Sequence, residues 1–219
     1  MIGALKVQTN DLVTIAVLGA VGWRLFGGLR RATSADGRNL LRVIVRGIRW
    51  RHFWPIPFVL AAIVIVVTLL VQLPGLNWGW WSAFGGQGNP VFGSNEATAG
   101  TAWEWIVPGV FMLMLLPALP LFAYAEERGF RTGAEDWSLG RRAYKVVTFG
   151  LIHAVIGIPI GAALGLSAGG AYFMWTYLRS YRVNGSATLS TFESTRAHAA
   201  YNFGIVIVVV IVVTATALS

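Results

Sequence analysis

Six stretches of this chain are apolar enough to be membrane-spanning helices, which need about 20 mostly apolar residues each. These stretches are Leu12–Trp23, Trp54–Leu73, Trp103–Ala125, Val146–Ile160, Gly161–Leu178 and Phe192–Leu218. The first is short, and the fourth and fifth are nearly continuous. Charged residues make up only 12% of the 219 positions, about half of the usual share in a soluble domain. The sequence therefore predicts an all-α integral membrane protein, a bundle of about six transmembrane helices.

The basic residues are distributed unevenly around these stretches. If successive loops alternate between two sides, one side receives 16 of the 17 Lys and Arg residues, and only Lys6 falls on the other. Basic loops stay on the cytoplasmic side. We therefore predict a multi-pass protein of the cell membrane with the Gly75–Thr101 loop and both termini outside. Asn89 should be reachable by an impermeant reagent from outside, and Arg38 and Ser138 only from the cytoplasm.

Between the first two stretches, basic and apolar residues form separate stripes at helical spacing. The basic stripe is Arg38, Arg42, Arg46 and Arg49, and the apolar stripe is Leu41, Ile44, Val45 and Ile48. This pattern predicts a basic amphipathic helix in the inner headgroup layer, in contact with anionic lipid headgroups. His52, between Trp50 and Trp54, is expected at the same interface.

The chain is short enough to form a single membrane domain, residues 1–219. Its N-terminal part, 1–100, would hold the interfacial helix and the exterior loop, and 103–219 would form a helical core. The net charge of +8 follows from topology and anionic lipid, since the basic residues flank apolar stretches. We therefore predict no nucleic-acid partner.

Three short polar patterns follow one another in the second half of the chain. They are Glu126-Glu127-x-x-x-Arg131, Phe149-x-x-x-His153 and His198-x-x-x-Asn202. Ionisable groups inside apolar segments cost roughly 2.5–3.5 kcal/mol each on insertion scales, so they mark a functional site. Residues four apart share one face of a helix. With the predicted topology, all three patterns approach the cytoplasmic leaflet and can form one site there.

These patterns, in this order on consecutive membrane helices, resemble the signature of the CPBP (Abi) family of intramembrane proteases, which includes the CAAX prenyl endopeptidases of the Ras-converting type. The resemblance covers about Trp103 to Leu218, and the first half of the chain adds nothing specific to it. It implies an endopeptidase that cleaves a membrane-associated protein or a lipidated peptide. It further implies that Glu126 and His153 act on a water molecule, and that His198 and Asn202 stabilise the oxyanion without a metal.

The chemistry of the residues is compatible with these implied roles. A positioned carboxylate can deprotonate water, and an imidazole and an amide one helical turn apart can donate to an oxyanion. Glu127 and Arg131 are spaced i,i+4 and can form a supporting charge pair. Phe149 is expected to pack near the site.

Other functions of the same residues stay open. Glu126, His153 and His198 form a two-His, one-carboxylate set that can ligate zinc, so a zinc-dependent intramembrane protease is the nearest alternative. Inward Glu and His residues also serve small-solute transporters, although no internal repeat is found. A non-enzymatic membrane scaffold or immunity factor on the same fold is a further alternative.

A serine-protease pattern in the fifth stretch carries less weight. Ser167 stands in a Gly-x-Ser-x-Gly sequence, but this pattern indicates a nucleophile only on a strand-to-helix turn. In an apolar helical stretch, Gly165 and Gly169 instead indicate close helix packing.

Overall fold

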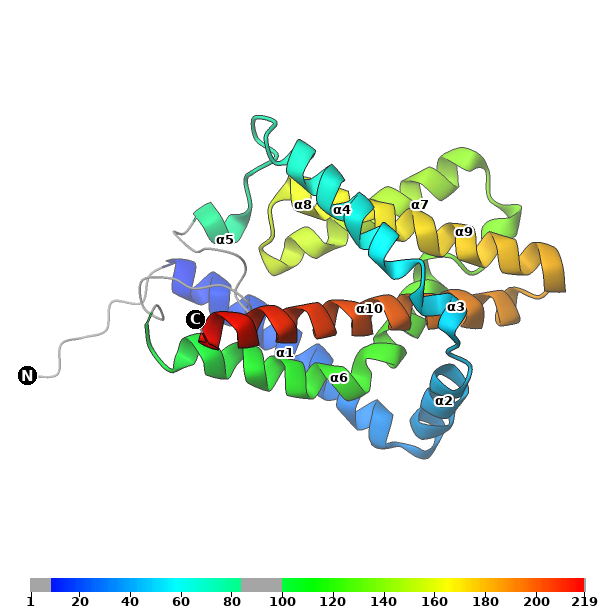
Figure 1. Ribbon diagram of the computed structural model, residues 1–219, viewed down its shortest axis with the longest axis horizontal. Helices are drawn as coiled ribbons and strands as arrows, with labels where there is room; N and C mark the ends of the chain where they lie inside the picture. Colours follow the sequence, from blue (N-terminus) through cyan, green and yellow to red (C-terminus); the bar gives the residue numbers. More distant parts are fainter. Residues whose placement is uncertain (1–8, 84–99, 219) are drawn as a thin grey trace, which may run out of the picture.

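The computed structural model describes residues 9–83 and 100–218, and every regular element in this part of the chain is a helix (Figure 1). The longer helices are α1 (Thr9–Thr33), α4 (Ile56–Leu70), α6 (Trp103–Phe130), α7 (Leu139–Leu151), α9 (Ser167–Asn184) and α10 (Ala187–Leu218). The shorter elements are α2 (Ala35–Arg46), α3 (Trp50–Phe53), α5 (Trp80–Ala83), α8 (Ile160–Gly165) and the 3-10 helices η1 (Ala134–Asp136) and η2 (Ile152–Ile156). The predicted all-α class is confirmed.

Three helical segments are long and apolar enough to cross a membrane: Leu12–Thr33, Trp50–Leu70 and Gly109–Asp136. Large apolar side chains such as those of Trp23 and Phe58 are 77% and 69% exposed. Extensive exposed apolar surface is compatible with contact to lipid, so both features are compatible with a membrane protein. The six spans and their sidedness remain predictions.

The two ends of the described chain lie on the same side of the molecule, since α1 begins and α10 ends at the left of Figure 1. Two positions used in the topology prediction, Lys6 and Asn89, lie outside the described residues, as does 84–99 of the predicted exterior loop.

The predicted fourth span, Val146–Ile160, is not one helix. The helix α7 ends at Leu151, and η2 continues the chain as a 3-10 helix. Gly157 then adopts a φ of 91°, a left-handed conformation that glycine adopts without strain. Pro159, which lacks the N–H that a helix interior needs, precedes α8. His153 therefore lies in η2, beyond the end of α7.

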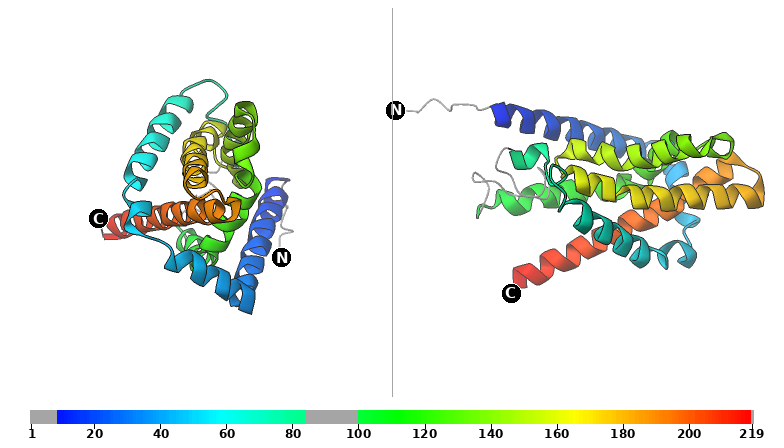
Figure 2. Two further views of the ribbon diagram at one scale, coloured as in Figure 1. Left: turned by 90° about the vertical axis from the view of Figure 1, so that its right-hand side faces the viewer. Right: turned by 90° about the horizontal axis from the view of Figure 1, so that it is seen from above.

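The helix α10 packs against both α6 and α9, and α7 lies beside α9 (Figure 2). Glycines allow α4 to approach α8 and α9. A Cβ atom on Gly165 would lie 2.3 Å from Val67 Cγ2, and one on Gly169 would lie 3.4 Å from Ile63 Cδ1. The predicted packing role is confirmed for Gly165, whereas a Cβ atom on Gly169 would make only an ordinary van der Waals contact.

The predicted amphipathic helix is α2. The Ser34 side chain caps its first turn by accepting a hydrogen bond from Gly37 N. Ile44 is fully buried, while Arg38, Arg42 and Arg46 are exposed. Arg49 is not part of this helix, because α2 ends at Arg46 and Arg49 precedes α3.

Candidate active site

Glu127 is the centre of a polar cluster between α6 and α10. Its side chain is fully buried. Its Oε1 accepts hydrogen bonds from Arg131 Nη1 and from His198 Nδ1, both at 2.9 Å, and its Oε2 accepts one from the Ser194 hydroxyl. Each helix contributes two of these residues at i,i+4 spacing, which places both on the face that meets the other helix. The buried carboxylate is therefore surrounded by donors.

Arg131 is also fully buried and balances the charge of Glu127. This is the charge pair that the i,i+4 spacing suggested. The guanidinium lies 4.1 Å from the centre of the Phe149 ring, and its Nη2 donates to the Gly170 carbonyl at 3.4 Å. A Cβ atom on Gly170 would lie 2.9 Å from Phe149 Cδ1. Glycine at this position lets α9 approach α7 and the guanidinium.

The imidazole of His198 is held in one orientation. It stacks on the Phe173 ring at a centroid distance of 4.2 Å and meets the Phe149 ring edge-on at 5.6 Å. Because a carboxylate only accepts hydrogen bonds, the bond to Glu127 places a proton on His198 Nδ1. In the neutral ring, Nε2 is then the free acceptor. This Nε2 lies 3.6 Å from Glu126 Oε2.

Glu126 differs from its neighbour in being open to solvent. Its side chain is 35% exposed, and its one ion contact in the described part of the chain is with His198. A separation of 3.6 Å is too long for a direct hydrogen bond but allows one water molecule to contact both atoms. Glu126 is therefore the carboxylate of the pair that can meet water.

His153 is half-buried, and its ring meets Phe149 edge-on at 5.4 Å. Its Nδ1 donates to the carbonyls of Phe149 at 2.9 Å and Gly150 at 3.3 Å, so its Nε2 remains an acceptor. His153 and His198 thus pack on the same phenyl ring. Within the described residues, no hydrogen bond or ion pair joins His153 to Glu126, whose observed neighbour is His198.

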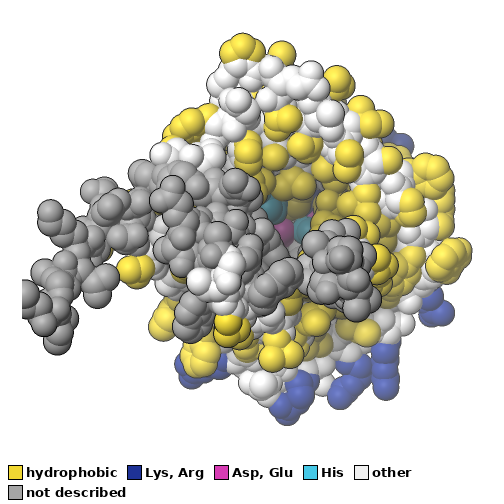
Figure 3. All heavy atoms as spheres, turned by 60° about the vertical axis from the view of Figure 1, so that its left-hand side comes forward, with side chains coloured by type: hydrophobic (Ala, Val, Ile, Leu, Met, Phe, Trp, Pro, Cys, Tyr) yellow, Lys and Arg dark blue, Asp and Glu magenta, His cyan; other side chains and the backbone are white. Residues whose placement is uncertain are grey.

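Asn202 lies one helical turn beyond His198 on α10 and is half-buried. Its side chain makes no hydrogen bond to the described part of the chain. In Figure 3, histidine and acidic side chains are visible at the bottom of a hollow, with hydrophobic side chains along its upper and right edges. Polar groups at the base of an apolar concavity are typical of a binding site.

Two members of the cluster were not predicted from the sequence. Ser194 lies four residues before His198, so helical spacing alone could have placed it on the same face. Phe173, which is fully buried, has no such signal, because aromatic residues are common throughout this chain.

His52, which was expected at the membrane interface, has a buried side chain that is only 3% exposed. Its Nδ1 accepts a hydrogen bond from Arg49 N at 2.8 Å, and its Nε2 lies 3.1 Å from Glu193 Oε1. The contact with Glu193 joins α3 to α10, and the two bonds together hold the ring inside the protein.

The alternative zinc ligands are not gathered in one place. Among residues 9–83 and 100–218, no group of three or more His, Cys, Asp or Glu side chains is arranged to hold a metal ion. Glu126 and His198 lie close together. In the same part of the chain, His153 interacts with neither of them.

Comparison of the chain with models of known protein families, with curated proteins and with solved structures finds no match. The resemblance to the CPBP family therefore rests on the three sequence patterns. The function has to be argued from the geometry of the site.

Proposed function

We propose that this protein is an intramembrane endopeptidase of the CPBP type, which hydrolyses a peptide bond of a membrane-associated protein or lipidated peptide. One observation carries the proposal. Glu126 Oε2 and His198 Nε2 lie 3.6 Å apart, and the imidazole is oriented by the buried Glu127 carboxylate. A histidine held by a carboxylate on one nitrogen, with the other nitrogen free, is a recurrent arrangement in hydrolytic enzymes.

The first step is activation of water between these two groups. Water donates one proton toward Glu126 and contacts His198 Nε2. Glu126 acts as general base and takes the proton, and the resulting hydroxide forms a bond to the carbonyl carbon. The carbonyl π electrons move to the oxygen. When the C–N bond then breaks, Glu126 returns the proton to the leaving amine.

The oxyanion needs hydrogen-bond donors that are already in position. The Asn202 amide group lies one turn beyond His198 and is free of other partners in the described residues. His198 is the second donor in this proposal, and it can donate from Nε2 only when the ring carries a proton on both nitrogens. His153, which also packs against Phe149, offers its Nε2 as an acceptor for the substrate or for water.

The surroundings of the site favour a substrate that is itself apolar. Hydrophobic side chains border the upper and right edges of the hollow in Figure 3, so this part of it suits a membrane-embedded or lipidated segment. Glu126 lies near the end of α6, four residues before its last residue Phe130, and basic residues follow it. With the predicted topology, cleavage takes place near the cytoplasmic leaflet.

The test is a comparison of Glu126→Gln with Asp136→Asn, an exposed carboxylate that serves as a matched control. Proteomic comparison of membranes containing each form should identify proteins that are cleaved only when Glu126 is present. With a verified substrate and purified protein, Glu126→Gln should reduce turnover by at least about 10²-fold, the usual range for loss of a general base. Asp136→Asn should retain activity.

Full cleavage by the folded Glu126→Gln protein would refute the proposal. A chelator separates the zinc alternative from the metal-free mechanism. Loss of cleavage with chelator, followed by recovery with zinc, would assign the reaction to zinc. A scaffold or transporter would show no cleavage that depends on Glu126.

A further inference from the structure

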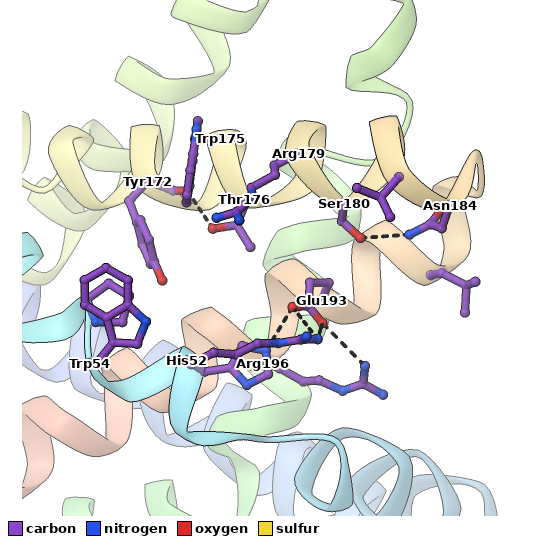
Figure 4. Close-up of a pocket in the computed structure, with 14 residues that line it drawn as sticks. His52, Trp54, Tyr172, Trp175, Thr176, Arg179, Ser180, Asn184, Glu193 and Arg196 are labelled. Carbon is purple, nitrogen blue, oxygen red and sulfur yellow. Dashed lines mark hydrogen bonds and ion pairs between the residues drawn. The ribbon is translucent and has the colours of Figure 1, made fainter.

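A cavity of about 500 Å³ lies between α3 with the turn that follows it, one face of α9 and the start of α10 (Figure 4). It shares α10 with the polar cluster of the candidate active site but lies on a different face of that helix. On α10 the cavity is lined by Glu193 and Arg196, whereas Ser194 and His198 face the active site. The cavity is therefore a separate site.

The walls of the cavity carry more positive than negative charge. Arg51, Arg179 and Arg196 line it, and Glu193 is its carboxylate. Glu193 is already bound by Arg51 and His52 on one side, and Arg196 Nη1 lies 3.8 Å from it. A single carboxylate cannot neutralise three guanidinium groups, so the cavity is suited to an anion.

Arg179 has guanidinium donors that are available to a ligand. It lies over the Trp175 ring at 5.1 Å, and it has no carboxylate or hydrogen-bond partner in the described part of the chain. The Arg196 guanidinium is already engaged, because it packs against Gly47 and its Nη2 donates to the Val43 carbonyl at 3.2 Å. Arginine binds phosphate well, because its planar donors match the phosphate oxygens.

Aromatic side chains form the rest of the wall. In Figure 4, Tyr172 projects from α9 into the cavity, and Trp54 stands on the opposite side. Trp54 and Trp175 are 55% and 52% exposed. Tryptophan and tyrosine with this exposure are typical of the membrane interface, where one part of the ring meets acyl chains and the other meets headgroups.

The location of the cavity agrees with this composition. It lies at the beginning of the apolar segment Trp50–Leu70, next to the amphipathic helix α2. Phospholipid phosphates are found at this level of a bilayer, where the ends of spanning helices emerge.

We propose that this cavity binds an anionic phospholipid, with its phosphate at Arg179 and its glycerol and first acyl carbons against Trp54, Tyr172 and Trp175. This site is distinct from the proposed protease site. Its occupation does not depend on proteolytic activity, and its test needs none.

The test measures how lipids raise the unfolding temperature of the purified full-length protein in a non-ionic detergent. Short-chain dihexanoyl phosphatidylglycerol, dihexanoyl phosphatidylcholine and glycerol 3-phosphate are titrated separately. A ligand that binds the folded state raises this temperature, and the rise grows with the logarithm of the ligand concentration divided by its Kd. Phosphatidylglycerol should bind at least about tenfold more tightly than either of the others. The choline cation of phosphatidylcholine would meet the excess positive charge of the cavity, and glycerol 3-phosphate lacks the acyl carbons that contact the aromatic side chains.

Arg179→Gln should weaken phosphatidylglycerol binding about tenfold, and Arg179→Lys should restore part of it. The matched control is Arg182→Gln, which removes an exposed arginine of the same helix that does not line the cavity. Arg179 is exposed, so its loss should not unfold the protein. Equal weakening by Arg182→Gln would mean nonspecific charge attraction and would overturn the proposal. Equal affinity for phosphatidylcholine, or for glycerol 3-phosphate, would overturn it as well.

Discussion

Two clusters in this protein each contain a histidine, a glutamate and an arginine: His198 with Glu127 and Arg131, and His52 with Glu193 and Arg51. They differ in whether the second ring nitrogen of the histidine is hydrogen-bonded. In the first, His198 donates from Nδ1 to Glu127, and its Nε2 makes no direct hydrogen bond within the described residues. In the second, His52 uses both nitrogens, because Nδ1 accepts from Arg49 N and Nε2 pairs with Glu193. Each carboxylate also binds an arginine. Only the first cluster has a ring nitrogen left for chemistry.

The two carboxylates that bind these histidines, Glu127 and Glu193, also differ in burial. Glu127 has no exposed surface, whereas the Glu193 side chain is 18% exposed at the edge of a cavity. The free nitrogen of His198 faces a second carboxylate, Glu126. A histidine, a glutamate and an arginine in contact therefore do not by themselves identify a reactive site. The number of uncommitted hydrogen-bonding atoms distinguishes a site from a structural tie.

The largest effect is expected where a buried charge loses its partner. Glu127→Gln should leave Arg131 charged and unpaired inside the protein, at a cost of about 3–5 kcal/mol in the free energy of unfolding. Chemical unfolding in detergent, with Glu126→Gln as the control, measures this difference. Adding Arg131→Met to Glu127→Gln should recover part of the loss. Equal stability of Glu127→Gln and Glu126→Gln would show that the two carboxylates are not distinct in burial.

The second prediction removes the free nitrogen and keeps the bond to the carboxylate. In His198→Asn, the amide nitrogen takes the place of Nδ1 and can still donate to Glu127, while nothing replaces Nε2. We expect proteolysis to fall at least about 10²-fold, with most of the stability retained. Turnover of a verified substrate and unfolding of the same preparation are both measured. Near-normal turnover would remove His198 from the mechanism.

The third prediction applies the same replacement to the second cluster. In His52→Asn, the side-chain oxygen can still accept from Arg49 N, but Glu193 loses the Nε2 partner. Because Glu193 keeps its bond to Arg51, loss of this hydrogen bond should lower the free energy of unfolding by about 0.5–1.5 kcal/mol, and proteolysis should be unchanged per folded molecule. A drop in turnover comparable with that of His198→Asn would contradict the structural role of His52.

The helical class and the amphipathic helix α2 could be predicted from the sequence because both depend on local composition and period. The pairing of Glu127 with Arg131 could be anticipated from the i,i+4 spacing. The contacts of Glu127 with Ser194 and His198 could not, since they join residues 67 and 71 positions apart. In addition, α6 is apolar nearly all round, so no periodicity indicates which of its faces lies inside.

The break between α7 and α8 was partly visible in the sequence as Pro159 and Gly161. Hydropathy averaged across it still suggested one span ending at Ile160, because η2 is as apolar as the helices beside it. The role of His52 was hidden for a different reason. Its partner Glu193 lies 141 residues away, and its neighbours Trp50 and Trp54 pointed to the interface.

The smallest effect is expected from the arginine of the second cluster. The Arg51 side chain is 64% exposed, and its Nη2 lies 2.9 Å from Glu193 Oε1. An exposed ion pair contributes about 0–1 kcal/mol, so Arg51→Gln should lower stability by less than about 1 kcal/mol. Because salt at about 1 M screens exposed charges within roughly 3 Å, this small loss should vanish at high salt, while the loss in His52→Asn should persist. Unfolding temperatures of both variants at low and high salt test the difference. A loss in Arg51→Gln that equals that of His52→Asn and survives high salt would mean that the arginine, and not the buried histidine, holds α3 against α10.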